Sequence, residues 1–256
     1  MRLLLPLLLL TATVAAEDNG MQLVFSDEFD RDGLPDPAKW GYEVGMLRNK
    51  ELQYYTKDRL ENARVEGGNL VITARKEAYG NATCTSASLN TRSTFPFTYG
   101  RIEVRAKVPT GRGVWPAIWT LGVDHETWPA CGEIDIMEYV GFDPDRVHAT
   151  VHTDAFNHVK NTHKGHAHPL PRVADDFHVF AADWTADGIT FFVDGVEINR
   201  YANDGKGDRA TWPFDTPQYL LINLAIGGGW GGAQGVDDAI FPAVYLIDYV
   251  RIYQKR

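Results

Sequence analysis

The most regular feature of the chain is an alternation of apolar and polar residues, the periodicity of a β-strand with one buried face. Residues 101–108 alternate without a fault between Arg, Glu or Lys and Ile, Val or Ala. Residues 190–193 and 196–198 flank Asp194-Gly195, a pair typical of a tight hairpin turn. Further strands are expected at residues 70–73, 218–225 and 245–253. The pattern therefore predicts β-structure over most of the chain.

Helical periodicity is missing from the same pattern, since no long window carries a convincing helical stripe. Glycine, proline, asparagine and aspartate separate the short apolar runs, which favours a β-sandwich. After residue 16 the sequence contains no repeat, no linker rich in proline or serine, and no low-complexity run. We therefore expect one domain over residues 17–256.

The first residues have the composition of an export signal. A positive Met1-Arg2 start precedes an apolar run at residues 3–10, and small residues end at Ala16, just before Glu17. This order predicts a secretory signal peptide at residues 1–16, and the apolar run is too short to span a bilayer. We expect a secreted protein, extracellular or periplasmic, with no membrane anchor.

The net charge of the chain argues against some classes of binding partner. The formal net charge is −9 and becomes −10 when Arg2 leaves with the signal peptide. An acidic protein has no electrostatic reason to bind nucleic acid or an anionic membrane, so we expect neither as a partner.

Cys84 and Cys131 are the only cysteines. In an exported protein they could pair, and the sequence leaves a disulfide and two buried thiols both open.

Candidate chemistry gathers in residues 132–138, where an apolar, strand-like segment contains three carboxylates. Side chains alternate between the faces of a strand, so Glu133 and Asp135 share one face. Strict alternation would send Glu138 to the other face, but a β-bulge at Met137 would absorb one residue and return it. Crowded carboxylates raise one another's pKa at a cost in stability that chemistry commonly explains. The two-carboxylate reaction that fits best is glycoside hydrolysis.

Several tryptophans lie in glycine- or proline-containing segments close to these acids or near the C-terminus. Exposed indole rings stack on the C–H face of sugars, and glycine leaves room for close approach. We expect Trp115, Trp128 and Trp230 to bind substrate; for Trp119, binding and core packing are both open, and Trp184 is expected in the core.

Residues 132–138 resemble the active-site signature of glycoside hydrolase family 16, in the form that carries the extra residue. Segments that match the family in the same order lie at residues 49–56, 99–107, 115–119, 151–153 and 226–230. The resemblance covers residues 23–253 and is greatest to the laminarinase-like members, which cut β-1,3-glucan. It implies a β-jelly-roll of two curved antiparallel sheets with a sugar cleft across the concave face. It also implies a monomer that needs no cofactor for catalysis.

The resemblance assigns unequal roles to the acids. Glu133 would be the nucleophile, Glu138 the general acid and base, and Asp135 would tune their ionisation. A retaining mechanism needs its two carboxyls about 5–5.5 Å apart, and two long glutamate side chains on one strand face are able to approach to that distance.

Other positions carry over from the family. Asn49 and Gln53 would contact sugar at the cleft edge. His152 would lie beside the catalytic strand, with a structural hydrogen bond as its alternative role. A structural calcium that family members often carry would match Glu28, Gly68 and Asp248, for which a solvated carboxylate is the alternative.

A run of histidines invites a metal interpretation, because His158, His163, His166 and His168 lie close together. Gly165, Pro169 and Pro171 instead predict a loop, which would not aim four imidazoles at one point. We therefore expect no zinc site there.

Two classes of function remain at this level. One is a retaining endo-glycosidase acting on β-1,3-glucan and, by extension, on mixed β-1,3/1,4-glucan. The other is a β-glucan recognition protein without activity, which the presence of all three acids disfavours. Among enzymes, agarases and carrageenases share the bulged signature, but sulfated polymers would favour a basic cleft.

Overall fold

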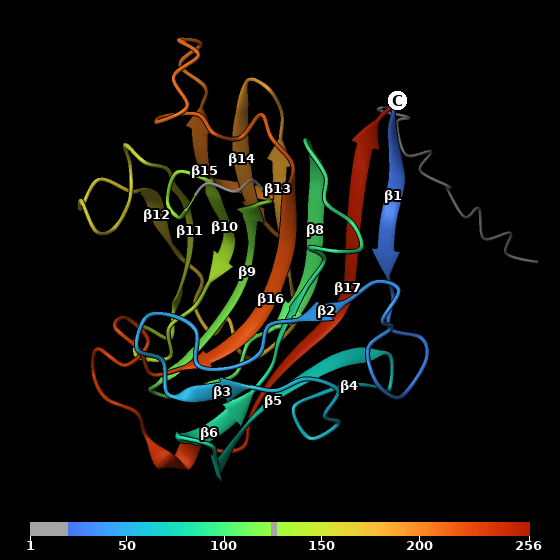
Figure 1. Cartoon of the computed structure of the whole chain (residues 1–256), viewed down its shortest axis with the longest axis vertical. Coiled ribbons are helices and arrows are strands. Elements are labelled where there is room, and N and C mark those ends of the chain that lie inside the picture. The colour runs from blue at the N-terminus through green and yellow to red at the C-terminus, as the bar shows by residue number, and fades with distance from the viewer. Residues whose placement is uncertain (1–19, 124–126) are drawn as a thin grey trace, which may run out of the picture.

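The computed structural model describes residues 20–123 and 127–256, which form two β-sheets packed face to face (Figure 1). The predicted signal peptide at residues 1–16 lies outside the described residues. No helix within the described ranges is long and apolar enough to cross a membrane. The sandwich of two sheets confirms the fold class that the alternating pattern predicts.

Ten of the described strands form the first sheet, in the order β15-β14-β13-β8-β17-β5-β6-β3, with β1 beside β17 and β4 beside β5. Its strands are β1 (Met21–Asp27), β3 (Gln53–Tyr55), β4 (Ala63–Glu66), β5 (Asn69–Tyr79), β6 (Ala82–Ser86), β8 (Gly100–Lys107), β13 (His178–Trp184), β14 (Gly188–Val193), β15 (Val196–Ala202) and β17 (Ala243–Lys255). Neighbouring strands are antiparallel except β3 and β6, which are parallel.

The second sheet has seven of the described strands, in the order β12-β11-β10-β9-β16-β7-β2. Its strands are β2 (Gly41–Tyr42), β7 (Ser88–Asn90), β9 (Val114–Gly122), β10 (Glu133–Glu138), β11 (Arg146–His152), β12 (Lys164–Pro169) and β16 (Gln218–Ile226). All its pairings are antiparallel. One short 3-10 helix, η1 (Asp238–Ile240), is the only helical element among the described residues.

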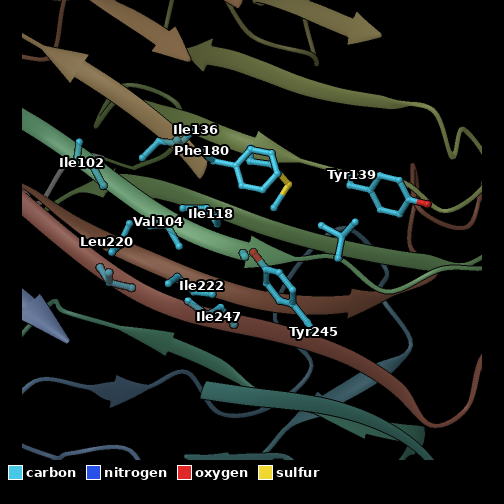
Figure 2. Packing of buried hydrophobic residues seen from close by; sticks show 14 of the residues in the cluster. Ile102, Val104, Ile118, Ile136, Tyr139, Phe180, Leu220, Ile222, Tyr245 and Ile247 are labelled. Atoms are coloured by element: carbon cyan, nitrogen blue, oxygen red, sulfur yellow. The ribbon is translucent and has the colours of Figure 1, made fainter. Parts of the chain in front are cut away.

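The core lies between the two sheets, where alternate residues of each point toward the other (Figure 2). Val104 of β8 and Phe180 of β13 come from the first sheet, and Ile118 of β9 and Ile136 of β10 come from the second. These side chains are at most 1% exposed. Their burial supplies the hydrophobic free energy that holds the sheets together.

Trp184 is fully buried in this core, which confirms the sequence-based expectation. Its Nε1 donates a hydrogen bond of 3.0 Å to the backbone oxygen of Phe214, so the buried indole N–H is satisfied.

Cys84 and Cys131 are also buried and no disulfide joins them. Burial raises the pKa of the Cys84 thiol to about 12.

The predicted hairpin is present as β14 and β15, and its two turn residues Asp194 and Gly195 have φ values of 50° and 80°. These left-handed conformations fit the twist of a two-residue hairpin turn. The loop predicted around His166 and His168 is wrong, because residues 164–169 form the edge strand β12 against β11. Pro169 is tolerated because it ends an edge strand, where its missing N–H disrupts no central ladder.

Candidate active site

An open cleft of about 820 Å³ crosses the face of the second sheet that points away from the core. Its floor comes from the central strands β9, β10, β11 and β16, whose alternate residues point outward. The lining residues are Arg48, Asn49, Glu51, Trp115, Ala117, Trp119, Leu121, Trp128, Glu133, Asp135, Glu138, His148, Thr150, His152, His158, His163, Asn223, Ala225, Gly229 and Trp230.

A β-bulge in β10 places all three acids in this cleft. Against β9, Asp135 pairs with Trp119 and Met137 pairs with Ile118, so Ile136 is the unpaired extra residue. Ile136 and Met137 are both buried in the core, 1% and 0% exposed. The next residue, Glu138, therefore returns to the outward face beside Glu133 and Asp135. The structure confirms the predicted bulge and shows that Ile136 and Met137 share it.

Two indole groups hold the outer acids from opposite ends of the trio. Trp128 Nε1 donates a hydrogen bond of 2.9 Å to Glu133 Oε2, and Trp115 Nε1 donates one of 3.0 Å to Glu138 Oε1. Each indole thus fixes one carboxyl oxygen of its glutamate. Hydrogen bonds to a carboxylate also favour its ionised form.

Burial dominates the ionisation of the two glutamates. Desolvation, with the nearby Asp135 charge second, raises the pKa of Glu133 to about 8. Desolvation, with the Glu133 charge second, raises the pKa of Glu138 to about 7. The imidazole of His152 and the two indole donors oppose these shifts in pKa. Between about pH 7 and 8 the two glutamates therefore hold about one proton between them.

Asp135 lies between the glutamates and is only 3% exposed. Burial and the charge of Glu138 raise its pKa well above the ordinary value. His152, which pairs with Glu133 across β10 and β11, places Nε2 at 3.3 Å from Asp135 Oδ2 and 3.8 Å from Glu133 Oε1. The predicted position of His152 beside the catalytic strand is thus what the structure shows.

Aromatic side chains form the walls of the cleft around Glu138. Trp115 and Trp230 meet edge to face with ring centroids 5.5 Å apart, and His148 meets Trp230 at 4.8 Å. Trp119 also lines the cleft but is only 8% exposed, and its Nε1 donates a hydrogen bond of 2.8 Å to Asn223 Oδ1. Trp119 is therefore packed in a buried cluster and also borders the cleft, and sugar binding by it stays a prediction.

Of the two residues predicted at the cleft edge, only one lines the cleft. Asn49 is exposed there and donates a hydrogen bond of 3.2 Å to Glu51 Oε1. The expectation for Gln53 is wrong, because its side chain is fully buried beneath the floor. Gln53 donates a hydrogen bond of 2.7 Å to Glu51 Oε2 and accepts one of 2.8 Å from the backbone N–H of Ile226. It therefore positions Glu51 and does not face sugar.

Sequence reasoning missed several lining residues, Glu51 above all. Glu51 is 6% exposed, and its burial raises the pKa of the carboxyl group. The hydrogen bond from Gln53 is the largest of the effects that lower this pKa. Tyr55 Oη donates to Glu51 at 3.3 Å and accepts from Asn223 at 2.9 Å. Glu51 lies just before the short strand β3, so strand alternation did not show that its side chain faces the cleft.

Arg48, His158 and His163 also line the cleft without having been predicted. The guanidinium of Arg48 lies 5.0 Å from the ring centroid of Trp119, a cation–π contact, and pairs with Glu43. The ring centroid of His158 lies 4.9 Å from that of Trp128. These residues come from connections, whose paths the strand periodicity does not predict.

The predicted calcium ligands lie away from the cleft, and calcium there stays a prediction. Arg251 engages both carboxylate oxygens of Glu28, at 2.9 and 2.7 Å, and Arg105 engages Asp248 Oδ2 at 2.6 Å. The carboxylate of each predicted ligand is thus already neutralised by a different arginine.

Comparison with known proteins gives one consistent family. Residues 50–251 match the family model described as glycosyl hydrolases family 16. A β-glucanase of Rhodothermus marinus is 53% identical over 244 residues, which are 91% of this chain and 85% of that protein.

Solved structures agree with the sequence matches. The laminarinase structure from Rhodothermus marinus superposes with a TM-score of 0.89 at 52% identity, covering 91% of this chain and 97% of that one. A variant of SCLam, a non-specific endo-β-1,3(4)-glucanase, superposes with a TM-score of 0.90 at 48% identity and covers 93% and 96%. That structure presents a 1,3-β-D-cellobiosyl-glucose at its active site.

Proposed function

The chain belongs to glycosyl hydrolases family 16, and from this premise we propose that it cleaves internal β-1,3-linkages of glucans by a retaining, two-step mechanism. The observation that carries the proposal is the placement of Glu133 and Glu138 on one face of β10, each held by an indole N–H. Mixed β-1,3/1,4-glucan is a second substrate of the same site, since the SCLam relative is described as non-specific.

In the first step, a carboxylate oxygen of Glu133 attacks the anomeric carbon while Glu138 transfers its proton to the departing glycosidic oxygen. The bond from the anomeric carbon to that oxygen breaks, and an ester between Glu133 and the sugar forms. The step needs Glu133 ionised and Glu138 protonated. Between about pH 7 and 8 the pair holds one proton, and the higher pKa of Glu133, about 8 against about 7 for Glu138, places it on Glu133 in the free protein, so this step requires the proton to pass to Glu138 when substrate binds.

In the second step, the carboxylate of Glu138 takes a proton from water, and the water oxygen attacks the anomeric carbon. The ester bond breaks and Glu133 is released as a carboxylate. Two inversions at the same carbon give net retention of configuration. Because Glu138 ends the second step protonated, both acids return to their starting states.

Asp135 and His152 set the charge around the nucleophile. Asp135 is too deeply buried to attack sugar, and its raised pKa favours the protonated form. A protonated Asp135 avoids a second negative charge beside ionised Glu133. His152 Nε2, within 4 Å of both carboxyls, stabilises the ionised nucleophile.

The aromatic walls explain why the substrate is a neutral sugar polymer. Trp115, Trp128 and Trp230 offer ring surfaces, and Asn49, Glu51 and Asn223 offer groups that hydrogen-bond hydroxyls. The cleft floor carries three buried acids, which would repel sulfate esters. This favours glucan over carrageenan.

Incubation with laminarin, lichenan, agarose and carrageenan, followed by sizing of the products, tests the proposal. We expect short oligosaccharides from laminarin, fewer from lichenan, and no products from the other two polymers. Inertness on all four by a folded protein would favour a recognition protein instead. Release of galactose-based oligosaccharides from agarose would show that the substrate class is wrong.

A further inference from the structure

We infer that the floor of the cleft also binds a divalent transition-metal ion of the zinc or copper class. Glu133, Asp135 and His152 each direct one ligand atom into a space in which the three atoms lie within 4.8 Å of one another. His152 Nε2 is 3.3 Å from Asp135 Oδ2 and 3.8 Å from Glu133 Oε1. Ligands about 2.0–2.2 Å from a tetrahedral zinc ion are roughly 3.3–3.6 Å apart, so small side-chain movements complete the set.

An unsatisfied buried atom gives independent support. Asp135 is only 3% exposed, and its Oδ2 accepts no hydrogen bond from any described residue. A buried acceptor without a partner costs free energy, and a metal ion at this point would satisfy it after displacing the proton from the carboxyl group. The Oδ2 atom is the same one that faces His152 Nε2, so the orphaned acceptor and the histidine converge on one position.

The ligand chemistry selects the class of metal. One imidazole nitrogen with two carboxylate oxygens suits Zn²⁺ or Cu²⁺, whereas Mg²⁺ and Ca²⁺ prefer oxygen ligands alone. Three protein ligands leave a fourth position toward the cleft. His158 and His163, whose ring centroids lie 5.2 and 5.9 Å from that of His152, border the same space.

Metal and substrate would exclude each other, because both need the same carboxylate of Glu133. An ion that holds the Glu133 lone pair prevents its attack on the anomeric carbon. This inhibitory consequence rests on the proposed function, while the binding itself does not. Zinc would therefore lower hydrolysis competitively with glucan, and oligosaccharide would weaken zinc binding.

Calorimetric titration of the full chain with zinc chloride near pH 7, without sugar, tests the binding. We expect one site in the wild type and a loss of at least about tenfold in affinity in Asp135→Asn and in His152→Gln. His166→Gln with His168→Gln is the matched control, since these histidines belong to β12 outside the cleft lining. The control should bind zinc as the wild type does, and magnesium chloride should give no heat of binding.

Unchanged zinc affinity in folded His152→Gln, or loss of affinity in the β12 control instead, would overturn the inference. Thermal unfolding monitors folding of each variant, and Glu133→Gln provides a third ligand variant if Asp135→Asn does not fold. The two proposals fail separately. Zinc binding without hydrolysis of laminarin contradicts only the proposed function, whereas hydrolysis without cleft-dependent zinc binding contradicts only the metal site.

Discussion

Trp115 donates a hydrogen bond of 3.0 Å from Nε1 to Oε1 of Glu138, so a residue of the sugar-facing wall also acts on the proton donor. The indole is held in turn by Trp230, whose ring meets it edge to face at 5.5 Å. Trp115 therefore both forms part of the cleft wall and influences the pKa of Glu138. Substitutions at Trp115 and Trp230 distinguish the loss of wall surface from the loss of this hydrogen bond.

Trp115→Phe should shift the pH profile of kcat/KM to higher pH. Loss of the N–H removes a donor that favours ionised Glu138, so the pKa of the acid rises further and Glu138 stays protonated to higher pH. We expect the alkaline limb to move up by about one unit, since a hydrogen bond to a charged group contributes roughly 1.5 kcal/mol. Trp230→Phe, which keeps the Trp115 donor, should raise KM and leave that limb in place. Equal shifts in both variants would show that the hydrogen bond does not act on Glu138.

Azide should restore turnover differently in the two glutamate variants. Glu138→Ala should lower hydrolysis of laminarin about 10²–10⁴-fold or more, because the departing oxygen is no longer protonated. With an aryl β-glucoside whose leaving group needs no proton, azide should attack the ester on Glu133 and yield a β-glucosyl azide. Glu133→Ala should instead give an α-glucosyl azide, because azide takes the place of the nucleophile. NMR of the products assigns the anomers, and a β product from Glu133→Ala would reverse the roles.

Glu138→Gln should stabilise the protein at alkaline pH. Folding raises the pKa of Glu138 from its ordinary 4.5 to about 7. A group whose pKa rises on folding contributes stability that is complete below about pH 4.5 and is lost as pH rises through about 7. The uncharged amide escapes that loss, while the neighbouring carboxyls of Glu133 and Asp135 still titrate.

We therefore expect the variant to exceed the wild type by about 1–3 kcal/mol at pH 8 and by little at pH 4, less than the full shift because the cleft admits water. Urea unfolding at the two pH values measures the difference. An advantage of the variant that is larger at pH 4 than at pH 8 would contradict the direction of the shift.

Gln53 and Asn49 should separate stability from substrate binding. Gln53→Ala removes one donor from the buried carboxylate of Glu51, which keeps Asn49 and Tyr55. It also leaves the N–H of Ile226 without its partner, so we expect a loss of about 1–3 kcal/mol. Asn49→Gly keeps the left-handed backbone conformation, φ 55°, and removes an exposed amide with its 3.2 Å hydrogen bond to Glu51, so stability should change by about 1 kcal/mol or less while KM rises. Thermal unfolding and laminarin kinetics on both variants test this, and a purely kinetic defect in Gln53→Ala would place its amide in contact with sugar.

The parts of the site that lie on regular strands were predictable from the sequence. Side chains alternate between the two faces of a strand, and a bulge shifts that alternation by one residue. The positions of Glu133, Asp135 and Glu138 along β10, with one bulge before Glu138, were therefore enough to predict that all three face the same side. Gln53 could not be placed in this way. It is separated from the catalytic strand by a long stretch of chain, and whether its amide faces sugar or supports Glu51 depends on how β3 packs under β16. The same limit applies to His163, whose position over the cleft comes from a connection of irregular path.

The bulge in β10 also has a consequence for how this strand tolerates change in length. Because Ile136 and Met137 both point into the core, removal of either one leaves the remaining residues alternating and still sends Glu138 outward. Insertion or deletion of one residue between Glu133 and Asp135, in contrast, would turn an acid inward. The strand thus has a single place where one residue is gained or lost without loss of the acidic face. Sequences that differ by one residue there present the same three acids, and a gap at that point of an alignment is no evidence of a lost active site.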